Sequence, residues 1–173
     1  MTTGDDTNRD KISSVIRYAC ERKFGALDNS FLCQSLSILD PVRPVCISEH
    51  ETIDGTVELL KGKRMGCLLV TNAAGKLVGI FSERDLLLKV NLRDPKSFDR
   101  PVSDFMTKDP VTAAMDMTLA FALNMMSEGG FRHLPIVDQD LMPVGIVSVK
   151  DVVDYLVKDF VNEILSFELP EPL

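Results

Sequence analysis

The sequence has few of the residues that catalysis and metal binding use most. Its 173 residues contain no Trp and only two His, His50 and His133, too few for a histidine-based metal site. There is no Gly-x-Ser-x-Gly and no Gly-rich loop ending in Gly-Lys-Ser/Thr, so serine hydrolases and phosphate-loop enzymes are excluded. No two Cys stand two residues apart, which leaves idle or buried thiols of a reducing compartment at Cys20, Cys33, Cys46 and Cys67.

Positive charge and long apolar runs are also scarce. The chain has 19 Lys+Arg against 26 Asp+Glu, a net charge of −7, which argues against a hold on nucleic acid phosphates. The longest aliphatic runs, such as 67–70 and 77–81, are far below the roughly 20 residues that span a bilayer. The first ten residues are polar and lack the apolar stretch of a secretion signal. We therefore expect a cytoplasmic globular protein without membrane or nucleic-acid contacts.

The informative feature is an internal repeat, in which the stretch 44–90 is similar to the stretch 110–156. Sliding the first onto the second needs no gap and conserves apolar character along its length. The identical pairs are Pro44/Pro110, Val45/Val111, Thr52/Thr118, Leu68/Leu134, Val78/Val144, Gly79/Gly145, Ile80/Ile146, Ser82/Ser148 and Asp85/Asp151. The chain therefore consists of two related halves.

Each half has the pattern strand, helix, strand, strand, helix. In the second half, a short strand over 111–113 precedes Thr118, an N-cap for a helix with one apolar face. Two apolar runs, 133–137 and 144–147, flank a polar turn, and a long helix follows Asp151. A half of about 50 residues makes a marginal core alone, so the two should pack together. The expected fold is α+β, with two β-α-β-β-α units related by a pseudo-twofold axis.

The rest of the chain is assigned by composition. The segment 1–40 lies outside the repeat and forms an N-terminal helical extension, with an amphipathic helix after Asp10. The first unit spans 41–95, the second 101–160, and 161–173 is the end of the last helix and a tail. Asn91–Ser103, with two Pro and five charges, is predicted to be an exposed linker.

Both halves carry Gly-Ile-x-Ser-x-x-Asp where a strand meets a helix, at 79–85 and 145–151. Ser-x-x-acid is the pattern of a capping box, but Asp is one methylene shorter than the usual Glu, which disfavours the return bond to the Ser amide. Alternatively, the free amides bind an anion while the carboxylate accepts two hydrogen bonds from a vicinal diol such as a ribose. Arg84 and Lys150, at equivalent positions in the motifs, either contact phosphates or are solvated.

These units and motifs, together with Leu-Pro-Ile-Val at 134–137 and the entry segment at 104–112, resemble tandem CBS domains (cystathionine-β-synthase domains) over residues 41–160. The resemblance implies a regulatory module that binds AMP, ADP or ATP, alone or with Mg²⁺, in two clefts between the units. S-adenosylmethionine or NAD(H) is an alternative ligand, since each offers adenine and a ribose diol. No catalytic cofactor is implied.

The family pattern also implies site residues. One cleft would use Ser82 and Asp85 for ribose and phosphate, and its base pocket would be formed by Thr107, Val111 and Thr112. The twin cleft would use Ser148 and Asp151, with Val45 and Ile47. Arg132 and His133 occur where the first half has Gly66 and Cys67, so only the second half has a fixed charge there. We therefore expect the Ser148/Asp151 cleft to take the more phosphorylated ligand.

The predicted function is a non-catalytic sensor that reports ligand occupancy to a protein partner in trans. The family's dimers form through helical faces, and the apolar segments 86–88 and 152–153 suit such a homodimer. The alternative is a ligand-free module for dimerisation or partner docking, in which Ser-x-x-Asp is only a helix cap.

Overall fold

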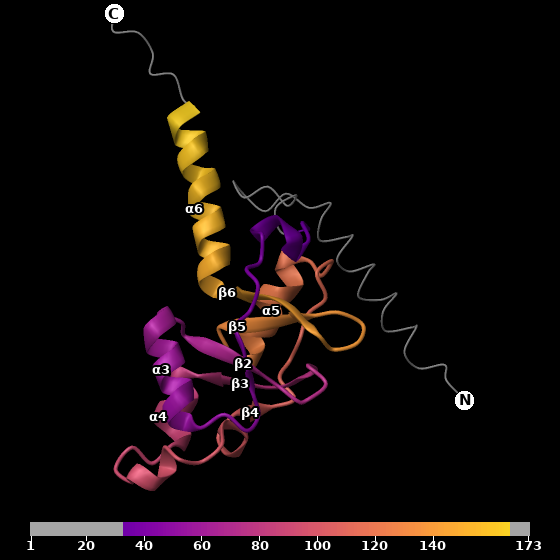
Figure 1. The fold of residues 1–173 in the computed structure, drawn as a ribbon. Helices are drawn as coiled ribbons and strands as arrows, with labels where there is room; N and C mark the ends of the chain where they lie inside the picture. Colours follow the sequence, from indigo (N-terminus) through magenta and orange to yellow (C-terminus); the bar gives the residue numbers. More distant parts are fainter. Residues whose placement is uncertain (1–32, 167–173) are drawn as a thin grey trace, which may run out of the picture.

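The computed structural model describes residues 33–166, with side chains described as far as Lys158. The helix predicted after Asp10 and the tail after Ser166 lie outside these residues. Two groups of strands and helices follow one another along the chain (Figure 1). In order they are η1 (Leu36–Leu39), β1 (Cys46–Ser48), α3 (Ile53–Lys63), β2 (Cys67–Thr71), β3 (Leu77–Ser82), α4 (Glu83–Lys89), η2 (Pro95–Ser97), η3 (Val102–Asp104), β4 (Thr107–Lys108), α5 (Leu119–Gly129), β5 (His133–Val137), β6 (Pro143–Ser148) and α6 (Val149–Ser166).

The strands form two sheets. The larger has the order β1-β2-β3-β4: β1 is parallel to β2, and β3 is antiparallel to both β2 and β4. The smaller is the antiparallel pair β5-β6. Since β4 belongs to the segment that enters the second unit, that segment completes the sheet of the first. The predicted order of strands and helices is confirmed except for the first strand of the second unit, and a long α6 ends it.

Alternation along β2 explains how the two sheets meet. Leu68 and Val70 belong to the core formed with α3 and α4, whereas Cys67 and Leu69 point to the other side and cluster with Ile146 of the second unit. All four β2 residues from Cys67 to Val70 are buried. This strand is therefore covered on both faces, by its own helices and by the partner unit.

Each unit packs against the chain segment that precedes the other unit. The amide of Ile53 donates to the Arg100 carbonyl, and at the equivalent place in the second unit the amide of Leu119 donates to the Gln34 carbonyl, both at 2.9 Å. Leu36 is fully buried in the second core, whereas Val102, its equivalent, is fully buried in the first. Gln34 to Asp40, assigned to the N-terminal extension from the sequence, thus pack with the second unit.

Three further expectations need correction. The strand predicted over 111–113 is a single bridge from Ala113 to Ile136. The predicted exposed linker contains η2 and η3, and its Ser97 is buried, because Phe98 and Arg100 carbonyls accept bonds from the first turn of α3. Cys33 is in a disulfide, so it is not an idle thiol, while Cys46 and Cys67 are free.

Candidate functional site

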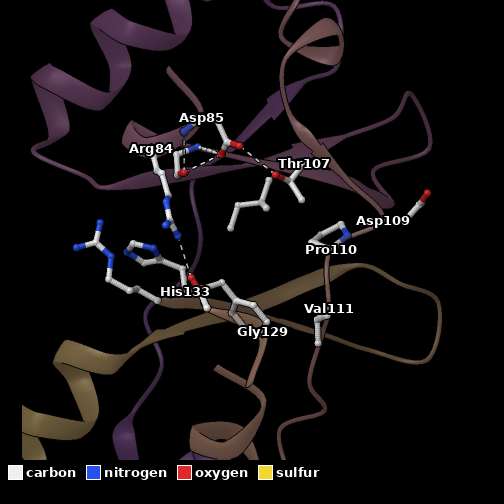
Figure 2. Close-up of a pocket in the computed structure, with 13 residues that line it drawn as sticks. Arg84, Asp85, Thr107, Asp109, Pro110, Val111, Gly129 and His133 are labelled. Atoms are coloured by element: carbon white, nitrogen blue, oxygen red, sulfur yellow. Dashed lines mark hydrogen bonds between the residues drawn. The ribbon is translucent and has the colours of Figure 1, made fainter. Parts of the chain in front are cut away.

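A cavity of about 340 Å³ lies between the two units (Figure 2). The first unit provides the end of β3 and the start of α4, and the second provides its entry segment and the turn from α5 to β5. The predicted site residues that line it are Ser82, Arg84, Asp85, Thr107, Val111, Arg132 and His133, and they are joined by Ile80, Asp109, Pro110, Gly129, Gly130 and Phe131.

Ser82 and Asp85 form a complete capping box at the start of α4. The Asp85 amide donates to Ser82 Oγ at 3.3 Å, and the Ser82 amide donates to Asp85 Oδ2 at 2.9 Å. Ser82 Oγ also donates to Oδ2 at 2.6 Å. The expectation that Asp is too short for the return bond is therefore wrong. The cap also holds the Asp85 carboxylate at the cavity wall, so a cap and a pocket coexist here.

The second oxygen of Asp85 has two further partners. Lys89 Nζ lies 2.7 Å from Oδ1, and Thr107 Oγ1 donates to Oδ1 at 3.0 Å. Lys89 Nζ also donates to Thr107 Oγ1 at 3.0 Å. Burial alone would raise the pKa of Asp85, but the bonds from Lys89, Ser82 and Thr107 outweigh it, so the pKa is lowered. Asp85 is therefore an ionised carboxylate although only 8% of it is exposed.

The opposite side of the cavity is cationic. Arg84 Nη1 reaches across from α4 and donates to the Gly130 carbonyl at the end of α5, at 3.0 Å (Figure 2). Arg132 follows that turn. Burial of the His133 side chain and the charge of Arg132 lower the pKa of His133, and they outweigh Asp151 and Glu83, which raise it. A neutral His133 leaves the two guanidinium groups as the fixed positive charges of the lining.

The sequence argument assigns Arg132 and His133 to the Ser148/Asp151 cleft, and the structure corrects this assignment. Both line the cavity of Ser82 and Asp85. The reason is that the two units face each other, so that the helix-to-strand turn of one unit lies opposite the Ser-x-x-Asp motif of the other. An argument from one unit's own sequence therefore placed the charge in the wrong cleft.

The family model for the CBS domain matches residues 38–91 and 102–158, which together make up more than half of the chain. The chain belongs to the CBS domain family. Its two units make it a CBS pair, and such pairs are regulatory modules rather than enzymes as a rule. An uncharacterized 17.7 kDa protein of Acidianus ambivalens is 35% identical over 106 residues, a match that covers 61% of this chain and 63% of that protein.

Solved structures of other CBS pairs have the same fold. A CBS-domain protein from Agrobacterium tumefaciens is 30% identical, with a TM-score of 0.64 over 71% of this chain and 98% of that one. CBSX2, solved in complex with AMP, is 27% identical, with a TM-score of 0.62 over 73% of this chain and 98% of that one. The predicted α+β arrangement of two CBS units is thereby confirmed.

The twin cleft of the CBS pair is built differently. Ser148 donates to Asp151 Oδ2 from its amide and its hydroxyl, each at 2.7 Å, so the cap is repeated. At the places of Thr107 and Lys89, however, the second site has Pro41 and Tyr155. Asp151 is exposed, in contrast to Asp85.

The other predicted residues of the CBS pair lie away from the cavity. Lys150 is solvent-exposed and forms an ion pair with Asp154. Ile47 is buried in the first core, and Val45 packs against that core. Thr112 is half-buried and does not line the described cavity.

Sequence reasoning missed part of the lining. Gly129 and Gly130 end α5, where Gly130 has φ of 65°, a typical left-handed helix end. That Gly-Gly pair was visible beside Arg132 and could have marked the turn. Lys89 was also visible, four residues after Asp85 on one helix, a spacing that brings opposite charges together.

Residues 33–166 contain no group of three or more His, Cys, Asp or Glu side chains that could hold a metal ion. Within the same range, no helix is long and apolar enough to cross a membrane.

Proposed function

We propose that this CBS pair is a regulatory module that binds AMP, ADP or ATP in the cavity of Ser82 and Asp85. The observation that carries the proposal is a buried, ionised Asp85 held across the cavity from Arg84 and Arg132. The volume of about 340 Å³ is within the range of small-molecule pockets. Together these features offer a diol acceptor and a phosphate site in one cleft.

We assign one part of the nucleotide to each wall of the cavity. Asp85 accepts the ribose hydroxyls, while the Arg84 and Arg132 guanidinium groups face the phosphates, which they bind as charged donors. Ile80, Val111 and Phe131 provide apolar surface for adenine. Binding of a phosphate would draw Arg84 away from the Gly130 carbonyl. The complex of CBSX2 with AMP supports an adenine nucleotide as the first ligand to test.

The output of the module is proposed to pass through a homodimer to a protein partner. Leu87 and Leu88 on α4 are 69% and 74% exposed, and Val153 and Val157 on α6 are 48% and 54% exposed. These side chains form the proposed dimer face. Leu86 and Val152, predicted for this role as well, pack in or against the two cores instead.

A second candidate is a ligand-free module for dimerisation or partner docking. The observation in its favour is that the Ser and Asp of both Ser-x-x-Asp motifs bond to each other as helix caps. The same exposed helical face would then be its functional surface. S-adenosylmethionine and NAD(H) remain alternative ligands of the first proposal.

Isothermal titration calorimetry separates these functions. AMP, ADP, ATP, S-adenosylmethionine and NADH, each with and without Mg²⁺, are titrated into the wild type, Asp85→Asn and the matched control Asp151→Asn. We expect an adenine nucleotide to bind the wild type and Asp151→Asn alike, and Asp85→Asn at least tenfold more weakly, since a hydrogen bond to a charged group contributes about 1.5–3 kcal/mol.

Binding that survives in Asp85→Asn but is lost in Asp151→Asn would place the ligand in the twin cleft. Absence of heat and of thermal stabilisation with all five compounds would favour the ligand-free module.

A further inference from the structure

The four donors on the Asp85 carboxylate form two matched pairs. On Oδ2, one donor is the Ser82 amide, at 2.9 Å, and the other is the Ser82 hydroxyl, at 2.6 Å. On Oδ1, one donor is the Lys89 ammonium, at 2.7 Å, and the other is the Thr107 hydroxyl, at 3.0 Å. Each oxygen thus has one nitrogen donor and one hydroxyl donor, which fills the roughly four acceptor positions of a carboxylate.

The donor residues differ in whether they line the cavity. Ser82 and Thr107 line the cavity, as does Asp85, whereas Lys89 does not. Lys89 reaches the carboxylate from the last residue of α4, and its side chain is 40% exposed. A hydroxyl can rotate its hydrogen to a new acceptor, but the Ser82 amide is fixed in the backbone. The hydroxyl donors are therefore exchangeable, whereas the Ser82 amide is fixed and Lys89 holds the carboxylate from outside the cavity lining.

We propose that Lys89 is a positioning residue for a vicinal diol. It fixes Oδ1 of Asp85 as the Ser82 amide fixes Oδ2, so that two ligand hydroxyls replace those of Ser82 and Thr107, one on each oxygen. The inference rests on the proposed function and refines it: the pocket selects a ribose over a deoxyribose, and one ligand binds per chain.

The twin cleft lacks half of this arrangement. Asp151 Oδ2 has the amide and hydroxyl of Ser148, but across residues 33–166 its Oδ1 accepts no hydrogen bond. Tyr155 replaces Lys89, and its hydroxyl donates to Gln34 Oε1 at 3.4 Å. Pro41, in place of Thr107, has no hydroxyl. Because the second oxygen is unsupported there, the twin cleft does not select a diol.

The groups around Asp85 agree with this role. Lys89 faces it from its own helix, Glu83 is two residues away, and the Cys67 thiol of β2 interacts with its charge. The other charged or titratable side chains of its cavity are Arg84, Asp109, Arg132 and His133. Of the contributions that lower the pKa of Asp85, the bond from Lys89 is the largest. Loss of the Lys89 ammonium therefore raises that pKa, and binding should fail at a higher pH than in the wild type.

The test compares AMP with 2′-deoxy-AMP by calorimetry on the wild type, Lys89→Met and Lys89→Arg. Lys61→Met is the matched control, since Lys61 also forms an ion pair on a helix of the same unit, but its partner Glu58 does not line the cavity. We expect Lys89→Met to weaken AMP about 10- to 100-fold and to reduce the preference for AMP over 2′-deoxy-AMP. Lys89→Arg should restore part of both, and the wild type should bind one AMP per chain.

The pH dependence adds a readout that simple loss of stability would not change. As the pH falls from 7 to 4, AMP binding to Lys89→Met should decline at a higher pH than binding to the wild type, because the pKa of Asp85 is higher in the variant. Titration of the AMP phosphate is common to both proteins and does not contribute to this difference. If Lys89→Met binds AMP with wild-type affinity and selectivity, or if two AMP bind per chain, the role of Lys89 is refuted. If the wild type binds no adenine nucleotide, the proposed function fails first.

Discussion

Replacement of Asp85 by Asn should destabilise the protein more than replacement of Asp151 by Asn, although both residues have the same place in the repeat. Both carboxylates accept from the amide and the hydroxyl of the preceding Ser. Only Asp85 is also bonded to Lys89 and Thr107, and it is the buried one of the two. The difference between the variants therefore isolates the bonds to Oδ1.

The magnitude follows from these contacts. Loss of a cap-type interaction costs about 0.5–2 kcal/mol, which is the expectation for Asp151→Asn. The bonds to Oδ1 add about 1–3 kcal/mol in Asp85→Asn, where the half-exposed Lys89 recovers hydration and reduces the loss. For a chain of this size, 1 kcal/mol corresponds to about 2–4 °C in Tm. Asp85→Asn should therefore melt at least a few degrees below Asp151→Asn.

Urea unfolding followed by circular dichroism measures both free energies without a ligand, from pH 8 to pH 3. The pKa of Asp85 is lower in the folded state, so its stabilising contribution is present above the unfolded value of about 3.9 and is lost as the pH falls through the folded value. The gap between the wild type and Asp85→Asn should stay constant down to about pH 5 and close only below about pH 4.

Equal destabilisation by the two Asn variants at pH 7 would refute this reasoning, because the bonds from Lys89 and Thr107 would then contribute nothing. A gap that widens on acidification would refute it as well, since it would require a raised pKa of Asp85.

Two further predictions test the packing of Leu36 and the proposed dimer face. Leu36→Ala should cost about 2–5 kcal/mol in urea unfolding, because Leu36 is fully buried in the second core, and a cost under about 1 kcal/mol would contradict that packing. Leu88→Glu should move the sedimentation coefficient from dimer to monomer, because it places a charge on the proposed dimer face, whereas the exposed Leu141→Glu serves as the control. A dimer that persists in Leu88→Glu would argue against this face.

The repeat made the order of elements predictable. Apolar positions recur at helical or strand spacing in both halves, so β2, β3, α5, β5 and α6 follow from local patterns. The prediction of a strand over 111–113 was wrong because a single bridge at Ala113 satisfies the backbone there. The prediction of an exposed linker was wrong because Val102 is buried against the first core. The charged, Pro-containing sequence around Val102 does not indicate this contact.

Candidate residues were predictable as a set but not as a site. The Ser-x-x-Asp motif pointed to Ser82, Asp85, Ser148 and Asp151 without distinguishing the two clefts. Lys89 and Gly130 were missed because their importance lies in what they contact. Their partners are Asp85 and Thr107 for Lys89, and Arg84 for Gly130.

The sequence by itself determined the duplication, the order of most strands and helices in the two units, and the two Ser-x-x-Asp motifs as caps or ligand sites, because these depend on spacing within a short stretch of chain. Only the tertiary structure decided that Arg132 faces Asp85, that Leu36 fills the second core and that Lys89 and Thr107 meet at one carboxylate oxygen. The physical reason is that two nearly equivalent units pack face to face. Each cleft therefore combines the motif of one unit with the turn of the other. The periodicity of the sequence does not show which motif meets which turn.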